Sequence, residues 1–216
     1  KRPSPQAPFM TGPAIQALMM SSASGRDVDP GIIMLALGAL ERSRSITGAV
    51  EYSGGDSRAA PGTHVPGSAG RMLVTESTLL MAGRGSVARV RGALDAFLAH
   101  WDALEARRAK TGTHEGPWGV APYYFFYAHL YAAQAIELLP EGVRGEYRVQ
   151  LRERILSVRS PEGTWNDRVF PRSAGYSTAL AMMSLTMPRF APIIEWSVPE
   201  TSDVEGQDEP SSSRKP

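Results

Sequence analysis

One stretch of the sequence, residues 86–110, reads SVARVRGALDAFLAHWDALEARRAK and places its large apolar residues at a helical period. These residues recur at alternating steps of three and four, with the charged residues between them: Val87, Val90, Leu94, Phe97, Trp101 and Leu104. Such spacing buries one stripe of a helix and leaves its other faces in water. The stretch therefore predicts an amphipathic helix from Ser86 to about Lys110.

Two other segments, Pro30 to Ser43 and Gly142 to Arg159, are amphipathic in the same way. The three segments begin at residues 30, 86 and 142, a spacing of 56 residues each time. Four more segments are apolar nearly all round, and their starts are 57, 54 and 54 residues apart: Thr11 to Met20, Ser68 to Met81, Pro122 to Leu139 and Tyr176 to Met187. Two helix series that share one interval are typical of a repeat protein.

The two series imply different positions in the fold. A helix without a polar face is buried on several sides, whereas an amphipathic helix lies at the surface. Their alternation predicts two concentric layers, with the apolar series inside. We therefore expect an all-α fold, an arc of an α/α toroid with about three helical hairpins and a seventh helix.

The residues at the segment boundaries support this division. Asp29 and Ser86 are of the types that cap helix starts, and Gly25 and Gly83 are of the type that ends helices. Each amphipathic segment is followed by a turn that combines glycine with an aromatic residue: Gly48 to Tyr52, Gly116 to Gly119 and Gly163 to Trp165. These turns should close one hairpin and open the next.

The chain divides into one repeat domain and two flanking segments. Residues 1–8 form an N-terminal extension, and residues 9–194 form the repeat domain. Residues 195–216 are rich in Ser, Pro, Asp and Glu, which predicts a disordered polar tail. Residues 53–67 hold several Gly and Pro and are interpreted as a long loop. Because the chain begins at Lys1 without a methionine, we expect it to be a segment of a longer product.

Composition narrows the function classes. The chain has 216 residues, 42% of them hydrophobic, and a net charge of +1, which predicts a soluble globular protein, cytoplasmic or exported, with no bias toward nucleic acid. No apolar run is long enough to span a bilayer. There is no cysteine, which excludes disulfides, thiolate nucleophiles and cysteine-ligated zinc. We expect no metal and no cofactor.

Three segments carry a resemblance to a known family: Ser160 to Trp165, Ser173 to Leu185 and Phe9 to Leu18. They resemble the prenyltransferase and squalene-cyclase repeat of the terpenoid cyclase fold, in which a Gly-x-Trp turn leads into an apolar helix that starts Tyr-x-Thr-Ala. The likeness covers about Phe9 to Pro188 and implies the α/α toroid. The glutamine that completes the family's turn element is replaced by Arg159 and Gly112.

The catalytic elements of that family are not found in this sequence. The resemblance implies an aspartate-rich acid for the cyclases, but Asp27-Val-Asp29 is followed by Pro30 and is interpreted as a helix cap. It implies a zinc site with cysteine for the protein prenyltransferases, and the chain has no cysteine.

A set of polar and aromatic residues lies in the turns that lead into the apolar helices. If the hairpins stack in register, these residues converge at one rim of the inner surface: His64, Arg71, Glu76, His114, Glu115, Trp118, Tyr123, Tyr124, Trp165, Asp167, Arg168, Arg172 and Tyr176. An aromatic pocket with a few charges is a typical ligand site. The alternative for the aromatic residues is packing in the core. For Arg71 and Glu76 it is a structural ion pair across adjacent hairpins.

Two functional hypotheses follow. The first is a noncatalytic binding or scaffold module, whose partner is an apolar small molecule or a protein segment that completes the toroid. The second is an enzyme related to terpenoid cyclases or prenyltransferases, with its acid in N-terminal repeats missing from this chain. A carbohydrate-active α/α barrel is a weaker third hypothesis, because it needs two facing carboxylates that the sequence does not identify.

Overall fold

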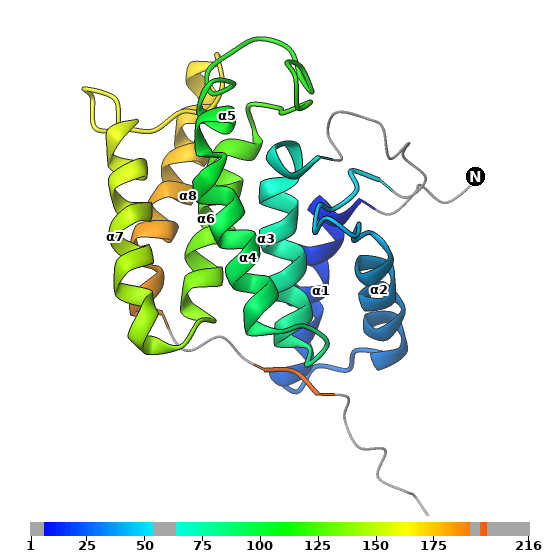
Figure 1. Cartoon of the computed structure of the whole chain (residues 1–216). Coiled ribbons are helices and arrows are strands. Elements are labelled where there is room, and N and C mark those ends of the chain that lie inside the picture. The colour runs from blue at the N-terminus through cyan, green and yellow to red at the C-terminus, as the bar shows by residue number, and fades with distance from the viewer. Residues whose placement is uncertain (1–6, 54–63, 191–194, 198–216) are drawn as a thin grey trace, which may run out of the picture.

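The computed structural model describes residues 7–53, 64–190 and 195–197. These ranges contain eight α-helices and two short 3-10 helices, with no β-strand (Figure 1). The α-helices are α1 Pro8–Ala23, α2 Pro30–Arg42, α3 Val65–Met81, α4 Val87–Ala99, α5 Trp101–Glu105, α6 Tyr124–Glu137, α7 Glu141–Ser157 and α8 Ala174–Thr186. The prediction of an all-α fold is confirmed.

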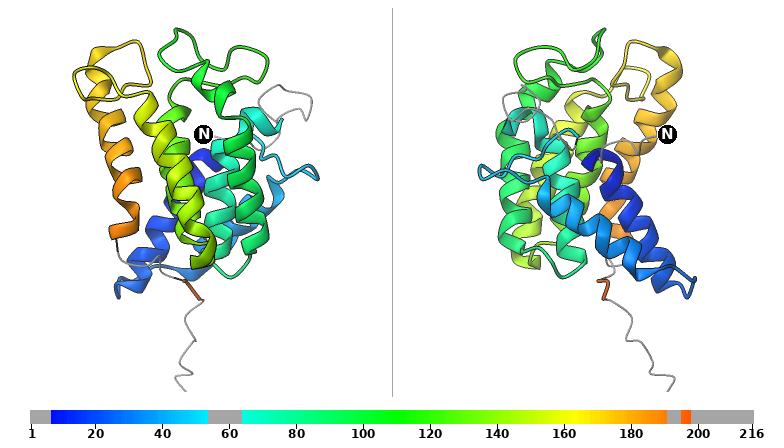
Figure 2. Two further views of the ribbon diagram at one scale, coloured as in Figure 1. Left: turned by 60° about the vertical axis from the view of Figure 1, so that its left-hand side comes forward. Right: turned by 90° about the vertical axis from the view of Figure 1, so that its right-hand side faces the viewer.

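The helices are arranged in two layers. Helices α1, α3, α6 and α8 contact one another in that order and form the inner layer. Helix α2 packs on α1 and α3, α4 packs on α3 and α6, and α7 packs on α6 (Figures 1 and 2). This is the order that the alternating periodicities predict. A toroid beyond this double layer stays a prediction.

Side-chain contacts show that the inner layer is strongly curved. Gln16 of α1 and Gln134 of α6 exchange two amide hydrogen bonds, of 3.0 and 2.9 Å between nitrogen and oxygen. The Gln16 amide also donates to the Thr78 hydroxyl of α3, at 2.9 Å. The first inner helix therefore reaches past the second to the third.

Asp29, Ser86, Gly25 and Gly83 lie at helix starts and ends as predicted. Two predicted spans are wrong, and the first is the loop of residues 53–67, because α3 already begins at Val65. The Asp29 carboxylate accepts from the Gly31 amide at 2.8 Å, and the Ser86 hydroxyl accepts from the Arg89 amide at 3.3 Å. Gly25 has a positive φ of 77°, which suits a helix end. The single helix predicted for residues 86–110 is wrong, because α4 ends at Ala99 and the short α5 follows the break.

Loop contacts explain why the helix does not continue to residue 110. After α5, the Ala109 amide donates to the Asp167 carbonyl at 2.9 Å, and Ala109 has a φ of 54°. The Arg107 guanidinium donates to the Val120 and Thr111 carbonyls. These long-range bonds hold residues 106–123 in a loop, called the rim loop below, where the local sequence favours a helix.

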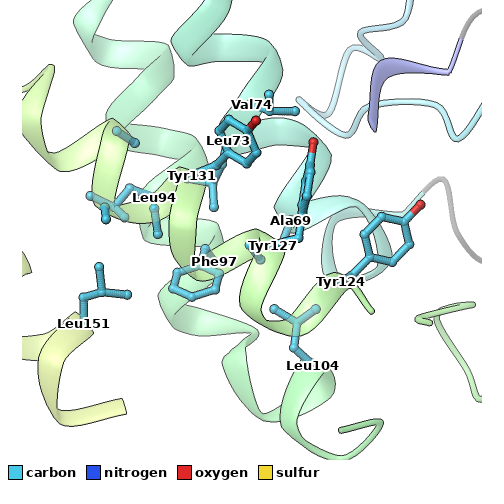
Figure 3. Packing of buried hydrophobic residues seen from close by; sticks show 14 of the residues in the cluster. Ala69, Leu73, Val74, Leu94, Phe97, Leu104, Tyr124, Tyr127, Tyr131 and Leu151 are labelled. Carbon is cyan, nitrogen blue, oxygen red and sulfur yellow. The ribbon is translucent and has the colours of Figure 1, made fainter. Parts of the chain in front are cut away.

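The main hydrophobic core lies between the two layers. Leu94 and Phe97 of α4, Leu151 of α7, Leu73 of α3 and the tyrosines of α6 belong to this one cluster of buried side chains (Figure 3). Almost every residue of α3 and α6 is buried, as the lack of a polar face predicts.

A second cluster joins α1 and α2 to a residue beyond α8. Trp196 is only 7% exposed and packs with Ile15, Met19 and Ile33, and its backbone amide donates to the Met81 carbonyl at 2.8 Å. The predicted disordered tail, residues 195–216, is therefore wrong at its start, because an apolar surface far away in the sequence buries this indole. The remaining tail, residues 198–216, lies outside the described residues, as do residues 1–6 and 54–63.

Candidate functional site

Two turns with the same hydrogen bonds lead into inner helices. In the turn before α3, the Ser45 amide donates to the Ala49 carbonyl, and Gly48 has a φ of 85°. In the turn before α8, the Ser160 amide donates to the Thr164 carbonyl, and Gly163 has a φ of 86°. Only glycine adopts this φ without strain. Two of the three predicted glycine-and-aromatic turns thus form the same structural unit, whereas in the turn at residues 116–119 the Gly119 amide donates to the Gly116 carbonyl.

Trp165 and Tyr52 follow these two turns and have different surroundings. Trp165 is buried, and its indole donates to the Ile155 carbonyl at 2.7 Å, so it anchors the turn to α7. Tyr52 is half-exposed and lies against the His114 ring, with 4.7 Å between ring centroids. Trp165 therefore acts as a packing residue, and Tyr52 extends the aromatic surface at the rim.

Arg71 and Glu76 of α3 are both buried, and they have different partners. The Arg71 Nε donates to the Val50 carbonyl at 3.2 Å, and its guanidinium lies over the rings of Tyr52 and Tyr124. Glu76 forms two charged hydrogen bonds, of 2.8 and 2.6 Å, with Arg44 from the end of the first hairpin. The predicted ion pair across adjacent hairpins is confirmed for Glu76, with Arg44 as its partner.

His114 is fixed in the rim loop by two polar contacts. Its Nδ1 lies 3.2 Å from the Gly119 carbonyl oxygen, so this nitrogen donates. Its Nε2 lies 3.0 Å from the Tyr123 hydroxyl, which donates to it in the neutral imidazole. Burial raises the pKa of Tyr123 well above its usual value, so the hydroxyl stays protonated. Burial also raises the pKa of Tyr124, to about 12, against the opposing charge of Arg71.

Asp167 ties α8 to both rim segments. Its carboxylate is fully buried and accepts from the Ser177 hydroxyl at 3.0 Å, and its backbone amide donates to the same hydroxyl at 3.2 Å. Its carbonyl accepts from Ala109 of the rim loop. Burial raises the pKa of the carboxyl, and the Ser177 hydrogen bond opposes that shift. Asp167 therefore holds the rim loop and the loop before α8 together through hydrogen bonds to Ala109 and Ser177.

Replacing Ser177 with alanine tests this interpretation. The change removes both bonds of the hydroxyl and leaves the Asp167 carboxylate buried without that donor, which costs about 1 to 3 kcal/mol of unfolding free energy. Urea denaturation measures the loss. The control is Thr178→Ala on the same helix, which removes a half-buried hydroxyl bonded to the Trp165 backbone. It should lower the free energy of unfolding by less than Ser177→Ala does. Equal losses would contradict the role of Asp167.

A pocket of about 360 Å³ opens between the rim loop and residues 168–170. It is lined by Lys110, Thr111, Gly112, Thr113, Pro122, Tyr123, Arg168, Val169 and Phe170. Figure 1 shows both loops at the same end of the helix layers, beside α5. The volume is within the range of about 300 to 1,000 Å³ for ligand sites. We call this site the rim pocket. A second pocket, of about 150 Å³ between α6, α7 and α8, is smaller than that range.

The predicted rim residues divide into two groups. Arg71, His114, Tyr123 and Tyr124 lie in one aromatic cluster, and Arg168 extends it because its guanidinium lies 5.6 Å from the centre of the Tyr123 ring. Arg172 does not line the rim pocket, but its guanidinium lies over the ring of the lining residue Phe170, 5.1 Å from the ring centre.

The others do not line the rim pocket. His64 and Trp118 are exposed and contact each other, with ring centroids 6.0 Å apart. Glu115 pairs with Arg107, at 3.4 Å between nitrogen and oxygen, and its carboxylate lies against Gly112 of the pocket lining. Tyr176 is 51% exposed on a face of α8 that also carries Met183.

Sequence reasoning missed Lys110, Val169 and Phe170 as pocket residues. The periodicity places Lys110 at the end of a helix, but in the structure Lys110 lies in the rim loop, beyond the end of α5. Val169 and Phe170 are 41% and 51% exposed. The sequence held one clue to Val169 and Phe170. They form an apolar pair directly before Pro171 in a polar loop, outside the periodic pattern of any predicted helix.

Within the described ranges, no group of three or more acidic or histidine side chains has a geometry suited to a metal ion. None of the helices described is both long and apolar enough to cross a membrane. The chain matches no family model, no curated protein and no solved structure. The resemblance to the prenyltransferase and squalene-cyclase repeat therefore stays a hypothesis that rests on the three sequence segments.

Proposed function

We propose that this chain is a noncatalytic binding module of a helical-repeat protein, which holds an apolar small molecule in the rim pocket. One observation carries the proposal: Val169 and Phe170 are exposed beside Tyr123 in a pocket of ligand size. Burying apolar surface under a ligand contributes about 25 cal/mol per Å².

The distribution of acidic residues favours binding over catalysis. None of the residues that line the rim pocket is acidic. Among the described residues the buried acids are Glu76, which pairs with Arg44, and Asp167, which is enclosed by Ser177 and has no exposed surface. The alternative, an enzyme related to terpenoid cyclases or prenyltransferases, requires an acid that faces the ligand.

Binding of the neutral fluorescent probe N-phenyl-1-naphthylamine tests the proposal. We expect saturable binding to the full chain, with one site and enhanced fluorescence. Phe170→Ser should weaken it about tenfold or more, because the ligand loses one aromatic wall of the pocket, which is worth at least about 1.4 kcal/mol. The matched control is Phe190→Ser, since Phe190 has the same exposure, 52% against 51%, beyond the other end of α8.

Equal weakening in the two variants, or no saturable binding to the unaltered chain, would overturn the proposed site. Near-ultraviolet circular dichroism shows whether each variant keeps its tertiary packing. The two serine variants change surface phenylalanines, so folding should survive in both.

A further inference from the structure

We propose that the rim pocket selects an anionic ligand: a small organic molecule with an apolar body and one carboxylate, sulfonate or phosphate group. This inference rests on the proposed binding function and adds the charge of the ligand to it. Its basis is the juxtaposition of Lys110 and Arg168 with the apolar wall formed by Tyr123, Val169 and Phe170.

The charges around the rim pocket are unbalanced. Lys110 and Arg168 line it, and Arg172 lies over its Phe170 wall. No lining residue is acidic. Two carboxylates lie beside the lining: Asp167 is fully buried, with its Oδ1 3.7 Å from the Arg168 Nε, and Glu115 lies against Gly112 and pairs with Arg107. Because Glu115 pairs with Arg107 and Asp167 is buried against Arg168, the lining itself carries two cations and no acid, in a chain whose net charge is only +1.

Arg168 is placed to bind an anion. Its guanidinium lies over the Tyr123 ring, 5.6 Å from the ring centre, and a guanidinium binds carboxylate or phosphate with paired hydrogen bonds. Its Nε is buried and has no hydrogen-bond partner among the described residues, because the Asp167 oxygen is beyond hydrogen-bond distance. The Arg168 side chain as a whole is 41% exposed, so the rest of its guanidinium stays accessible to a ligand while its Nε faces Asp167.

The apolar wall excludes a bare inorganic anion as the preferred ligand. Val169 and Phe170 expose apolar surface that an inorganic phosphate leaves in water. The pocket, about 360 Å³, is too small for a macromolecular polyanion, and its cations do not extend into a stripe. An amphiphilic small molecule covers the wall and neutralises the cations at the same time.

Two probes with the same aromatic body and different charge test this selectivity. 8-Anilinonaphthalene-1-sulfonate carries a sulfonate that N-phenyl-1-naphthylamine lacks. We expect the anionic probe to bind the full chain at least about tenfold more tightly at low salt. Raising sodium chloride to about 1 M should remove most of the difference, because salt screens partly exposed charges.

Charge variants identify the residues responsible. Arg168→Gln and Lys110→Gln should each weaken binding of the anionic probe about three- to tenfold and leave binding of the neutral probe unchanged. The control is Arg89→Gln, which removes an exposed cation at the start of α4, away from the rim loop. Displacement by decanoate and by decyl phosphate, with decanol as the neutral competitor, distinguishes carboxylate from phosphate ligands.

Failure of this inference is distinguishable from failure of the proposed function. Equal affinity for the two probes, together with unchanged affinities in Arg168→Gln and Lys110→Gln, would overturn the anion preference and leave the binding module in place. If Phe170→Ser changes the affinity of neither probe, the rim pocket is not the site and both proposals fall. Weaker binding of the anionic probe in Arg89→Gln as well would show a nonspecific charge effect and would also overturn the anion site.

Discussion

Arg44→Met is expected to lower the free energy of unfolding by about 3 to 5 kcal/mol, the largest effect that we predict for a single substitution outside the rim pocket. The Glu76 side chain is only 5% exposed, and its two carboxylate oxygens bond to the Arg44 guanidinium. Removing the arginine leaves a buried carboxylate without its counter-ion. Urea denaturation followed by circular dichroism at pH 7 measures the loss.

The matched variant is Arg44→Met combined with Glu76→Met. Replacing both members of a buried ion pair with apolar residues is often neutral, so the double variant should recover most of the stability that Arg44→Met loses. A double variant as unstable as Arg44→Met would show that the arginine acts through packing of its stem against the turn rather than through the ion pair. Recovery supports the view that this pair joins the first two hairpins.

Acidification is expected to remove about 3 kcal/mol of stability through His129 alone. His129 is fully buried in α6; its Nδ1 donates to the Phe125 carbonyl at 2.7 Å, and its Nε2 accepts from the Trp101 indole at 2.9 Å. Burial lowers the pKa of His129 from 6.5 to about 4. The folded state therefore holds the neutral imidazole, while the unfolded chain takes up a proton below pH 6.5. This contribution is complete above pH 6.5 and is lost as the pH falls from there to about 4.

Comparison with His129→Gln isolates this effect from other titrating groups. The stability gap between the unaltered chain and the variant should narrow by about 3 kcal/mol between pH 7 and pH 4, because only in the unaltered chain does proton uptake by residue 129 stabilise the unfolded state. Gln16→Leu is the control, since it removes a buried polar side chain that does not titrate, and its gap should stay constant with pH. A constant gap for His129→Gln would mean that its pKa is not lowered in the folded chain.

Much of the helical framework could be predicted because its signals are local. The cap at Asp29, the break after Gly25 and the stripe that contains Leu94 and Phe97 each depend on neighbours within one or two helical turns. The glycine in the turn at Gly163 is another local signal, since its φ of 86° restricts the residue type. The kind of element at each of these positions was predicted, and the first and last residues of the helices differ from the prediction by a few residues.

The candidate site was predicted only in part, because its geometry depends on contacts between distant segments. His114, Tyr123 and Arg168 were expected at one rim, and their mutual contacts agree with that expectation. Lys110 joins them only because the Ala109 amide bonds to Asp167, 58 residues further along the chain. No local pattern encodes such a bond. The partner of Glu76 was missed for the same reason, since Arg44 carries no signal that distinguishes it from the other arginines.

The sequence by itself determined the fold class, the order of buried and half-exposed helices and the places where glycine turns divide them, since periodicity and backbone preferences act over a few residues. Only the tertiary structure decided where the helix after Ser86 breaks, that Trp196 packs against the first hairpin, and that Lys110 and Phe170 line one pocket. These outcomes depend on which apolar surfaces and unpaired backbone groups meet across the fold. At these positions, burial and hydrogen bonding between distant segments outweigh the local conformational preference. A difference of a few kcal/mol is enough to select one loop conformation over another.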